Sequence, residues 1–468
     1  MVGIRAIGAY VPKHRMAKET VGWGSPSERA VANFDEDSVT MATAAAIDCL
    51  HGLEPHLVDG ILFATTSNPY FEKQSASTIA TALDLRRDIF SEDLASTLRA
   101  GTSGLRAAAD AVRAGSAKNV LVTAGDIRLA YPKSDMERYL GDGGAALLIS
   151  DTDVAVEIEA AHFVTTHMVE LWRSTTDAYI RSGEDRFITE EGYLPAIIGA
   201  ATGLAKKTKL TPKDFAKAVI YAADPRRHAD IGRRLGLTPQ QLQDPMFGVL
   251  GNTGTAFPLM MLAAALEDAK PGDRILLIGY GDGADAYALK VTDKIEQARA
   301  GRRLIKKHLA SKAKLPAYEN FLRWRGLLAA EPARRPDPLP ISLQAAWRDA
   351  ERNLRLHGGK CTACGHIQYP PQKQCAFCKA VDSWVPVRLS DKQAKIVTFS
   401  MDYVAGTHDV PLVITVVDFD GGGRALLMMA DRDIDQIKVG MPVEMTFRKL
   451  GVIGGVHNYY WKSAPIRA

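Results

Sequence analysis

The sequence predicts an α/β protein with a duplicated layered fold, followed by a small zinc ribbon and a β-barrel. Three observations support this prediction. Within the first 292 residues, apolar runs alternate with helix-like segments rich in small residues. A loop–helix–strand–glycine pattern occurs twice in that part, and four cysteines gather between Cys361 and Cys378. Strands that are apolar throughout are typical of sheets covered on both faces, and their alternation with helices is typical of layered folds.

The composition is that of an ordinary globular protein. At about 150 residues per domain, 468 residues correspond to roughly three domains. A net charge of +4, with 24% charged and 46% hydrophobic residues, argues against disorder and against a strongly basic nucleic-acid binder. No apolar run reaches the roughly 18 residues of a membrane helix, and the N-terminus shows no signal-peptide pattern. We therefore expect a cytoplasmic protein.

The pattern of apolar residues predicts the elements of the first part. Buried strands are predicted at 60–65, 119–124, 145–149 and 274–278. Helices are predicted at 38–50, 74–84, 103–114, 226–235 and 258–268. This order of elements indicates strand–helix–strand units rather than an all-β or all-α protein.

The internal repeat divides the first part into two halves. In the first copy, Ala100-Gly-Thr-Ser-Gly104 opens a helix, and the next strand leads to Gly125-Asp126. In the second copy, Gly251-Asn-Thr-Gly-Thr-Ala256 opens a helix, and the next strand leads to Gly281-Asp-Gly283. Chance similarity between two α/β pieces is the alternative. We predict a duplication, with halves at 1–150 and 151–292.

The remaining residues have a different character. Residues 293–340 are predicted to be a helical and proline-rich linker, because four prolines fall within 331–340. A short helix and the zinc ribbon follow at 341–385. A β-barrel is predicted over 386–468, with strands at 394–400, 412–418, 424–429 and 443–447.

The cysteine cluster predicts a metal site. Cys361 and Cys364 form one C-x-x-C pair and Cys375 and Cys378 form a second, with ten residues between the pairs. Four thiolates at this spacing bind Zn²⁺ tetrahedrally and leave no open position, so the metal is expected to be structural. Iron bound as in rubredoxin is the alternative. Cys49 is predicted to be a core thiol.

Residues 1–292 resemble the hydroxymethylglutaryl-CoA synthase branch of the thiolase superfamily, which is related to the ketoacyl synthases. The strings that carry the resemblance include Ile7-Gly-Ala-Tyr-Val-Pro12, Arg99-Ala-Gly-Thr102, Gly141-Asp-Gly-Gly-Ala145, Leu171-Trp-Arg173 and Leu250-Gly-Asn-Thr253. Residues 341–468 resemble the zinc-ribbon and OB-fold module that accompanies thiolase-type enzymes. The resemblance implies a duplicated thiolase-type fold, an OB-fold at 386–468, an acyl-CoA substrate and at least a homodimer.

The resemblance also places three catalytic groups that this sequence lacks. The family's cysteine nucleophile falls on Leu98, its glutamate on Thr66 and its histidine on Ala223. A leucine cannot be acylated, so a conventional synthase or thiolase that works through an acyl-enzyme is not expected.

Several hypotheses for function remain. The first is aldol or retro-aldol chemistry on a 3-hydroxyacyl-CoA, which needs a base and stabilisation of an enolate but no nucleophile. The second is a catalytically silent member that binds acyl-CoA or acts as a scaffold. A third is an acyltransferase of the synthase or thiolase type. Nucleic-acid binding by the OB-fold is disfavoured, because aspartates dilute any basic face. The aromatic string Tyr459-Tyr-Trp461 is instead predicted to pack at an interface or to line an acyl channel.

Six residues are candidates for the active site. Tyr70, Asn252 and Asp126 are the catalytic candidates, and Lys73, Arg99 and Arg128 are candidates for binding the CoA substrate. Asn252 matches a site residue of the family and, with backbone amides at 98–102, is expected to donate hydrogen bonds to the enolate. Tyr70 is the leading proton-transfer candidate, with Lys73 as a neighbour that lowers its pKa. Asp126 and Arg128 follow a strand end, where α/β sites commonly lie, and Arg99 lies in the loop of the family's nucleophile. Each has a structural alternative: packing for Tyr70, ion pairs for Lys73 and Arg99, and capping of a turn for Asp126.

Overall fold

The computed structural model describes residues 1–329, 331 and 342–467 and divides into two compact units. The first unit comprises Met1–Ala32, Asp37–Ala80 and Leu85–Tyr318. The second comprises Asn33–Glu36, Thr81–Asp84 and Glu319–Ala468. Of the predicted proline-rich segment at 331–340, all but Glu331 lies outside the described residues.

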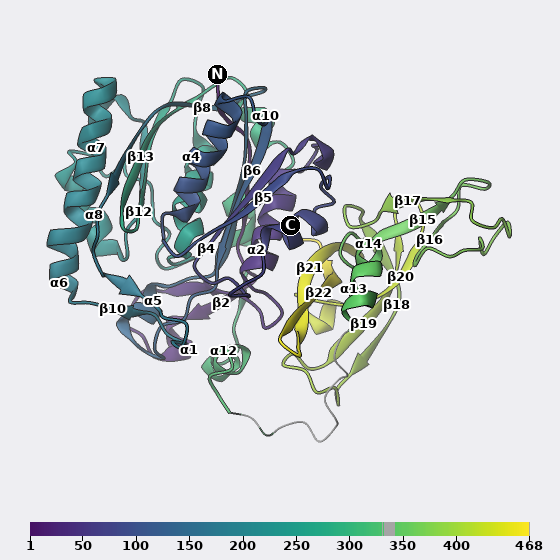
Figure 1. Cartoon of the computed structure of the whole chain (residues 1–468). Coiled ribbons are helices and arrows are strands. Elements are labelled where there is room, and N and C mark those ends of the chain that lie inside the picture. Colours follow the sequence, from purple (N-terminus) through teal and green to yellow (C-terminus); the bar gives the residue numbers. More distant parts are fainter. Residues whose placement is uncertain (330, 332–341, 468) are drawn as a thin grey trace. The chain divides into compact units, whose positions relative to one another are not determined.

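A nine-stranded mixed sheet forms the centre of the first unit (Figure 1). Its strand order is β11-β12-β13-β8-β1-β7-β6-β4-β5. The strands are β1 (Gly3–Tyr10), β4 (Gly60–Thr65), β5 (Phe90–Ala95), β6 (Asn119–Asp126), β7 (Gly143–Ser150), β8 (Val156–Thr165), β11 (Lys217–Ile220), β12 (Arg274–Tyr280) and β13 (Gly283–Val291). Every residue of β4, β6 and β7 is buried, as the apolar runs predicted.

The order and direction of the strands repeat between the two halves of the sheet. In the first half β4 is parallel to β6, and β6, β7 and β1 follow as antiparallel neighbours. In the second half β11 is parallel to β12, and β12, β13 and β8 follow as antiparallel neighbours. The halves join where β1 pairs with β8. This repetition confirms the duplicated layered α/β fold.

Helices cover both faces of the sheet. An added Cβ on Gly144 would meet Met41 of α2 (Ser38–Cys49), and one on Gly143 would meet Met260 of α9 (Phe257–Asp268). Because neighbouring residues of a strand point to opposite faces, α2 and α9 lie on opposite sides. The other main helices are α3 (Ala76–Ala82), α4 (Ala100–Arg113), α7 (Leu194–Thr208) and α8 (Pro225–Arg234).

Shorter elements complete the first unit. One small sheet consists of β2 (His14–Ala17), β3 (Glu28–Val31) and β14 (Ala313–Lys314), and a separate two-stranded pair consists of β9 (Leu171–Trp172) and β10 (Arg181–Ser182). The short helices are α1 (Lys18–Val21), α5 (Asp135–Tyr139), α6 (Asp185–Phe187), α10 (Ile295–Arg299), α11 (Leu304–Ala310) and α12 (Tyr318–Trp324), the last of which continues into the second unit. The predicted linker region 293–340 therefore contains several ordered helices.

The second unit contains two small sheets after α13 (Leu343–Arg348) and α14 (Ala350–Asn353). The ribbon sheet consists of β15 (His357–Cys361), β16 (Ile367–Gln368) and β17 (Trp384–Arg388). The OB-fold sheet consists of β18 (Ala394–Asp402), β19 (Leu412–Phe419), β20 (Arg424–Met428), β21 (Pro442–Ile453) and β22 (Val456–Pro465). It closes on itself where the Ala430 N–H donates to the Ser463 carbonyl at 2.9 Å.

The aromatic string Tyr459-Tyr-Trp461 was expected at an interface or in an acyl channel. That expectation was wrong for Trp461, which lies in β22 and is fully buried, and whose indole N–H donates to the Leu354 carbonyl at 2.7 Å. Tyr459 stacks on Phe447 with ring centroids 5.5 Å apart. Both side chains therefore belong to the packing of the second unit.

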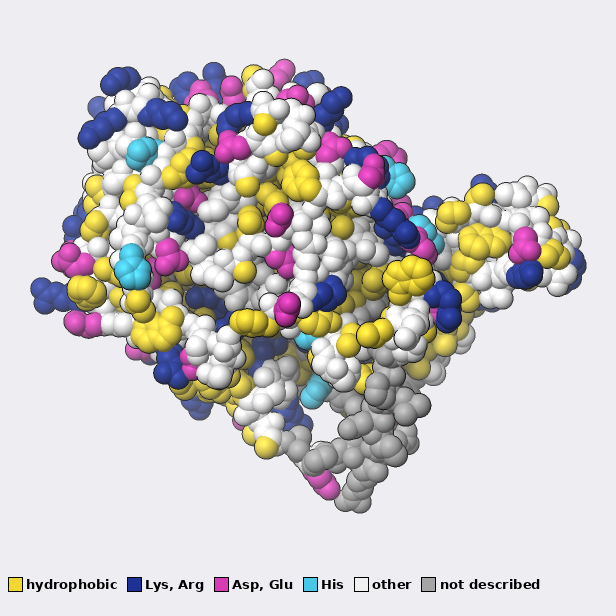
Figure 2. Space-filling model, viewed as in Figure 1, with side chains coloured by type: hydrophobic (Ala, Val, Ile, Leu, Met, Phe, Trp, Pro, Cys, Tyr) yellow, Lys and Arg dark blue, Asp and Glu magenta, His cyan; other side chains and the backbone are white. Residues whose placement is uncertain are grey.

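The surface carries both signs of charge. Lys and Arg side chains interleave with Asp and Glu over the visible face of the larger unit (Figure 2), in keeping with the net charge of +4. No helix within the described part of the chain is long and apolar enough to cross a membrane.

Candidate functional site

Two adjoining cavities lie in the first unit. The outer cavity, of about 690 Å³, is lined from the loops after β4 and β5 and from β9. The inner cavity, of about 280 Å³, is lined from α5, α6 and the ends of β11 and β12. The two cavities share four lining residues: Leu98, Arg128, Glu170 and Leu171. These shared residues mark the point where a ligand would pass from one cavity to the other.

The three positions at which the resemblance places the family's catalytic groups all line these cavities. Leu98 lines both of them, Thr66 lines the outer cavity and Ala223 lines the inner one. Leu98 lies two residues before the first residue of α4 and is 7% exposed. None of the three side chains carries an ionisable group, so any proton transfer here requires other residues.

Asn252 lies in the wall of the inner cavity, but its side chain is engaged by the protein. Its Nδ2 donates to the Tyr221 hydroxyl at 3.0 Å and to the Ala222 carbonyl at 3.2 Å. Its Oδ1 accepts from the Gly254 N–H at 2.9 Å. Asn252 therefore positions the Tyr221 phenol and is not available as the enolate donor that the sequence indicated.

Tyr70 lines the outer cavity, as a proton-transfer candidate should. Lys73 lies with its Nζ 5.4 Å from the centre of the Tyr70 ring and donates to the Gln74 carbonyl and the Thr78 hydroxyl, both at 2.9 Å. Partial burial lowers the pKa of Lys73, and Asp93 opposes that shift. The Lys73 ammonium therefore lies beside the Tyr70 ring while it donates hydrogen bonds to other groups of the protein.

Both carboxylate oxygens of Asp126 accept hydrogen bonds from neighbouring residues of the protein. One carboxylate oxygen accepts hydrogen bonds from the Thr65 hydroxyl, the Thr66 N–H and the Ser67 hydroxyl, at 2.7–2.9 Å. The other accepts from the N–H and hydroxyl of Thr255, at 2.8 and 2.9 Å. Asp126 is fully buried. Both oxygens of the Asp126 carboxylate are therefore engaged by the protein, which agrees with a structural role for this residue rather than a catalytic one.

Two arginines that were candidates for binding CoA differ in their surroundings. Arg99 donates to the Val164 carbonyl and forms an ion pair with Asp285 at 3.3 Å, so the Asp285 carboxylate neutralises its charge. Arg128 lines both cavities and is 7% exposed. Within the described residues its guanidinium makes neither a hydrogen bond nor an ion pair.

Comparisons with known proteins identify the family. Residues 205–292 match the family model "3-Oxoacyl-[acyl-carrier-protein (ACP)] synthase III C terminal". Residues 348–383 match "ChsH2, rubredoxin-like zinc ribbon domain", and residues 386–448 match "ChsH2, C-terminal OB-fold domain". The chain is 34% identical over 311 residues to the hydroxymethylglutaryl-CoA synthase of Thermococcus sibiricus, an alignment that covers 64% of this chain and 89% of the relative. The chain belongs to the hydroxymethylglutaryl-CoA synthase family.

Further relatives of the synthase family agree with this assignment. The hydroxymethylglutaryl-CoA synthase of Pyrobaculum arsenaticum is 32% identical over 345 residues, covering 70% of this chain and 98% of the relative. Among solved structures, MvaS in complex with 3-hydroxy-3-methylglutaryl coenzyme A has a TM-score of 0.61 at 21% identity, covering 72% of this chain and 94% of that one. The 3-oxoacyl-[acyl-carrier-protein] synthase III of Aquifex aeolicus has a TM-score of 0.57 at 21% identity, covering 62% and 100%. These structures confirm the thiolase-type fold.

Sequence reasoning missed Glu170 as a proton-transfer candidate in this synthase-family cavity. Glu170 lines both cavities, is 6% exposed, and accepts a hydrogen bond from the Tyr280 phenol. Burial raises the pKa of Glu170, and the Tyr280 hydrogen bond lowers it only in part. A carboxyl group with a raised pKa can act as both base and acid near neutral pH. The available signal was its place directly before the Leu171-Trp-Arg173 string.

Tyr221 is a second polar group that the sequence did not indicate. It lines the inner cavity two residues before Ala223, and its ring stacks on Tyr280 with centroids 6.0 Å apart. Burial raises the pKa of Tyr221, while the charge of Arg128 lowers it. The phenol of Tyr221 therefore lies within the field of the Arg128 guanidinium.

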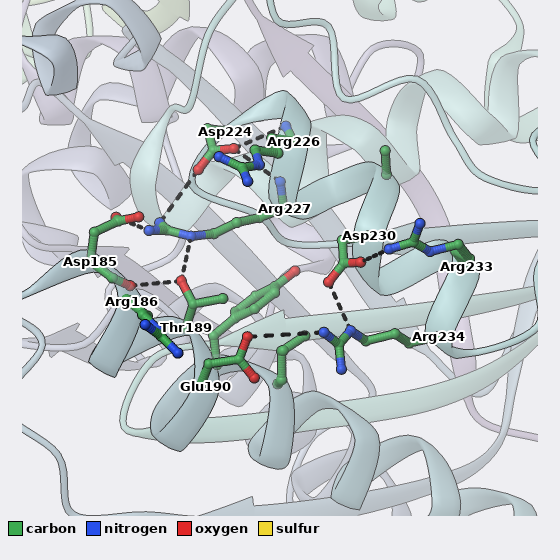
Figure 3. Close-up of a pocket in the computed structure, with 13 residues that line it drawn as sticks. Asp185, Arg186, Thr189, Glu190, Asp224, Arg226, Arg227, Asp230, Arg233 and Arg234 are labelled. Carbon is green, nitrogen blue, oxygen red and sulfur yellow. Dashed lines mark hydrogen bonds and ion pairs between the residues drawn. The ribbon is translucent and has the colours of Figure 1, made fainter.

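A third, arginine-rich cavity of about 810 Å³ adjoins the inner one (Figure 3). The two share Asp185, Tyr193, Asp224 and Arg227. Arg227 is paired with Asp185 and with Asp224. Two exposed guanidinium groups, those of Arg186 and Arg226, form no hydrogen bond or ion pair with other described side chains. This cavity therefore offers free positive charge to an anionic ligand.

The four predicted metal ligands come together in the second unit. The sulfurs of Cys361, Cys364, Cys375 and Cys378 lie within 4.8 Å of one another. The Cys361–Cys378 and Cys364–Cys375 sulfur pairs are 3.6 and 3.7 Å apart. A tetrahedral site with Zn–S bonds of about 2.3 Å requires sulfurs about 3.8 Å apart. The donor set therefore fits a structural zinc ion. Cys49 is fully buried, and burial raises its pKa to about 12.

Proposed function

We propose that this protein makes or breaks a carbon–carbon bond in a 3-hydroxyacyl-CoA, by aldol or retro-aldol chemistry, without a cysteine-bound acyl group. Membership of the hydroxymethylglutaryl-CoA synthase family supports acyl-CoA carbon–carbon chemistry. The observation that carries the proposal is Leu98, which lines both cavities at the position of the family's nucleophile. An aldol step needs no acyl-enzyme, so this substitution does not prevent it.

Glu170 is proposed as the proton-transfer group. In the cleavage direction the Glu170 carboxylate takes the proton of the substrate's 3-hydroxyl, and the C2–C3 bond breaks. The electron pair of that bond passes to the thioester, which becomes an enolate. The 3-carbon becomes the carbonyl of the released aldehyde or ketone. Glu170 then returns its proton to C2, which yields the shorter acyl-CoA. The reverse sequence forms the bond. Tyr280, which donates to Glu170, holds the carboxyl group in position.

The enolate requires a hydrogen-bond donor near the thioester. The Leu98 N–H is suited to this role, because it makes no hydrogen bond within the described part of the chain. A Cβ added to Gly281 would lie 2.9 Å from the Leu98 nitrogen, so the absence of a side chain at Gly281 keeps this amide accessible. Tyr70, in the wall of the outer cavity, remains a second candidate for proton transfer.

The CoA portion of the substrate is proposed to use the basic residues outside the inner cavity. Arg173 lines the outer cavity and donates to the Thr66 carbonyl at 2.7 Å, and Arg186 and Arg226 line the arginine-rich cavity. Guanidinium groups bind phosphates through paired N–H donors. Lys73 is less suited because its ammonium donates to two protein groups, and Arg99 because Asp285 already neutralises its charge. The single hydrogen bond of Arg173 leaves its other guanidinium N–H groups for a phosphate.

Further parts of the proposal concern assembly and location. Zinc at the four cysteines is structural, because four sulfur ligands leave no position for water or substrate. A homodimer or larger homo-oligomer in the cytoplasm completes the proposal. The edge strand β5 has mostly exposed or half-exposed residues and is paired only with β4 among the described strands, so it can accept another strand.

A catalytically silent acyl-CoA binder is the second candidate function. It is favoured by the replacement of three catalytic positions by Leu98, Thr66 and Ala223. An acyltransferase that works through an acyl-enzyme is not favoured, since leucine offers no nucleophile at position 98. Measured conversion of acyl-CoA substrates distinguishes an active enzyme from a silent acyl-CoA binder.

The test is incubation of the full chain with a panel of 3-hydroxyacyl-CoA esters, followed by mass spectrometry of both the CoA pool and the intact protein. We expect a shorter acyl-CoA, an equimolar carbonyl product and no mass added to the protein. A stable acyl adduct on the chain would establish covalent catalysis and contradict the proposal. Binding of the esters without any turnover would support the silent alternative.

A further inference from the structure

Tyr221 carries a hydroxyl hydrogen for which the described residues supply no acceptor. The residue directly follows β11, is 2% exposed and lines the inner cavity. Its hydroxyl oxygen accepts a hydrogen bond from the Asn252 Nδ2 at 3.0 Å, and this is the one hydrogen bond of that hydroxyl within the described part of the chain. A buried donor without a partner costs free energy. The arrangement therefore suits a ligand in the inner cavity that offers an oxygen to this hydrogen.

Two backbone groups fix the direction of the hydrogen bond between Asn252 and Tyr221. The Gly254 N–H can only donate, so the Asn252 oxygen must face it, at 2.9 Å. The Ala222 carbonyl can only accept, so the Asn252 nitrogen must face it, at 3.2 Å. The amide therefore cannot be turned over, and the Tyr221 oxygen beside the same nitrogen must accept. Asn252 thus directs the Tyr221 hydrogen away from itself.

Two further buried tyrosines line the inner cavity, and both donate their hydrogens to the protein. The Tyr193 hydroxyl donates to the Tyr221 carbonyl at 2.6 Å, and the Tyr280 hydroxyl donates to Glu170. The Tyr221 ring is also held in place. It stacks on Tyr280 with centroids 6.0 Å apart and meets Phe257 edge to face at 5.9 Å. Tyr221 therefore offers a rigidly held donor to the cavity, whereas the hydroxyls of its two neighbours are occupied.

We propose that Tyr221 donates a hydrogen bond to the 3-oxygen of the bound substrate, and that Asn252 positions it for this role. The inference rests on the proposed function and adds the group that binds the oxygen next to the reacting bond. In the cleavage direction Glu170 takes the proton of the 3-hydroxyl, and the Tyr221 hydrogen bond stabilises the negative charge that develops on the oxygen. In the direction of bond formation it polarises the carbonyl. The phenol keeps its own proton throughout, so the balance of the reaction is unchanged.

The surroundings of Tyr221 favour the 3-oxygen over the thioester oxygen. Tyr221 is not among the described residues that line the outer cavity, whereas Leu98, whose N–H is assigned to the enolate, lines both cavities. Glu170 and Tyr221 contact the same neighbour, Tyr280, through its hydroxyl and its ring. Burial raises the pKa of Tyr221, and the nearby charge of Glu170 raises it further. The oxygen that Glu170 deprotonates therefore lies on the side of the cavity where the Tyr221 hydroxyl is held.

The hydrogen bond is tested by calorimetric binding of two thioethers, S-(3-hydroxybutyl)-CoA and S-butyl-CoA. They differ only in the 3-hydroxyl, and they lack the thioester oxygen, so no enolate forms and a difference in affinity reports on the 3-oxygen alone. The proteins are the unmodified chain, Tyr221→Phe, Asn252→Asp and the control Tyr403→Phe, which removes a hydroxyl from a side chain that is 65% exposed. Thermal melting reports whether each variant is folded.

The two cavity variants remove the contact in different ways. Tyr221→Phe keeps the ring and its packing but removes the hydroxyl. Asn252→Asp keeps the phenol and places an oxygen where the Asn252 nitrogen lies. That oxygen carries at most one hydrogen, which the Ala222 carbonyl takes, so it accepts the Tyr221 hydrogen and turns it away from the ligand.

We expect the unmodified chain and Tyr403→Phe to bind the hydroxy thioether about fivefold more tightly than the plain thioether, which is the scale of one buried hydrogen bond. Tyr221→Phe and Asn252→Asp should each reduce that preference to about twofold or less. A folded Tyr221→Phe variant with the preference of the unmodified chain would overturn the inference, as would an unmodified chain that shows no preference or binds neither thioether. A preference lost in Tyr221→Phe but kept in a folded Asn252→Asp variant would overturn the positioning role of Asn252.

Two rates distinguish this inference from the proposed function. One is the conversion of 3-hydroxybutanoyl-CoA, and the other is the exchange of the C2 hydrogens of acetyl-CoA in heavy water, which needs the enolate but no 3-oxygen. Tyr221→Phe should slow conversion by about 10²–10³-fold and leave exchange within about twofold. If the hydroxy thioether is preferred through Tyr221 but no ester is converted, the hydrogen bond stands and the proposed reaction fails. If the ester is converted and Tyr221→Phe slows conversion and exchange equally, or slows neither, the proposed reaction stands and the inference is overturned.

Discussion

The zinc ribbon and the thiolase-type cavity place their functional groups in opposite ways. The four sulfurs of the ribbon come from residues 361–378, so one short segment carries the whole donor set. The cavity gathers Leu98, Glu170, Tyr221 and Tyr280 from distant parts of the chain. In the ribbon the motif and the site are the same residues. In the cavity the residues at the family's catalytic positions, Leu98, Thr66 and Ala223, only line the walls, and other side chains supply the ionisable groups.

The two sites therefore differ in what the loss of their motif residues does to function. A ribbon that lost its cysteines would keep only His366 as a metal-ligating side chain between residues 361 and 378, which is too few to hold a zinc ion. The cavity lost three catalytic positions and still contains a buried carboxyl group, two buried phenols and an unpaired guanidinium. Loss of a nucleophile therefore removes one mechanism from the cavity without removing its capacity for proton transfer.

The largest expected effect is on the ribbon. Cys375→Ser should abolish zinc binding and unfold residues 357–388, because structural zinc sites contribute about 10 kcal/mol or more to local folding. Metal analysis should fall from one equivalent of zinc per chain to none, and limited proteolysis should cut within the ribbon. Cys49→Ala is the matched control and should retain one equivalent. Full zinc content in Cys375→Ser would contradict a four-sulfur site.

The next effect tests the ionisable groups of the cavity. Glu170→Gln keeps the size of the side chain but removes the transferable proton, so turnover should fall by about 10²–10⁴-fold. Steady-state kinetics on the best hydroxyacyl ester measures this change. Glu191→Gln alters an exposed glutamate and is expected to leave turnover unchanged. Turnover in Glu170→Gln within a factor of three of the unmodified chain would exclude Glu170 as the proton-transfer group.

Substitutions of Asp126, the last residue of β6, and of Arg128, two residues later, test how each side chain affects stability. Asp126→Ala removes a buried carboxylate that accepts five hydrogen bonds, two of them from backbone amides, and should lower the free energy of unfolding by about 3–5 kcal/mol. Arg128→Met removes an unpaired buried charge and should leave that free energy unchanged or raise it by about 1 kcal/mol. Urea unfolding of the larger unit measures both. A similar loss in the two variants would assign Arg128 a structural role.

The smallest effect concerns His228, which lies five residues after Ala223, the position of the family's missing histidine. It is 4% exposed, its Nε2 has no partner among the described residues, and burial lowers its pKa from 6.5 to about 4. The unfolded chain binds the proton more readily between these values, so stability should fall as pH drops from 6.5 toward 4. Between pH 7 and pH 5 the loss is about 2 kcal/mol.

His228→Leu should remove that acid-dependent loss and leave turnover at pH 7 unchanged. Thermal melting at pH 7 and pH 5, beside activity at pH 7, measures both outcomes. A large loss of activity in a folded His228→Leu variant would show that this side chain takes part in the reaction.

Much of the fold followed from local patterns. The apolar runs placed β4, β6, β7 and β12, and the repeated loop–helix–strand pattern gave the duplication that the strand order confirms. The pattern was weaker for β8, most of whose residues are half-buried, and for β22, whose aromatic residues were assigned to an interface. Partial burial and aromatic content do not reveal which strand lies beside which, because pairing depends on the whole topology.

The candidate site was less predictable. The metal ligands were found because they are close in sequence, and Arg128 because it follows a strand end. Glu170 and Tyr280 lie 110 residues apart in the chain and meet only after folding. Asn252 lines the inner cavity, and Asp126 accepts hydrogen bonds from Thr65 and Thr66 of the outer one, but the sequence could not show that hydrogen bonds to the protein already occupy both side chains.

Leu98 also makes the cavity accessible to chemical labelling. Of the five cysteines, four gather at the metal site and Cys49 is fully buried. A Leu98→Cys variant would introduce a thiol where both cavities meet, two residues before a helix whose N-terminus favours the thiolate. A fluorine tag attached there would report by nuclear magnetic resonance when a ligand enters, so occupancy could be followed even for compounds that never react.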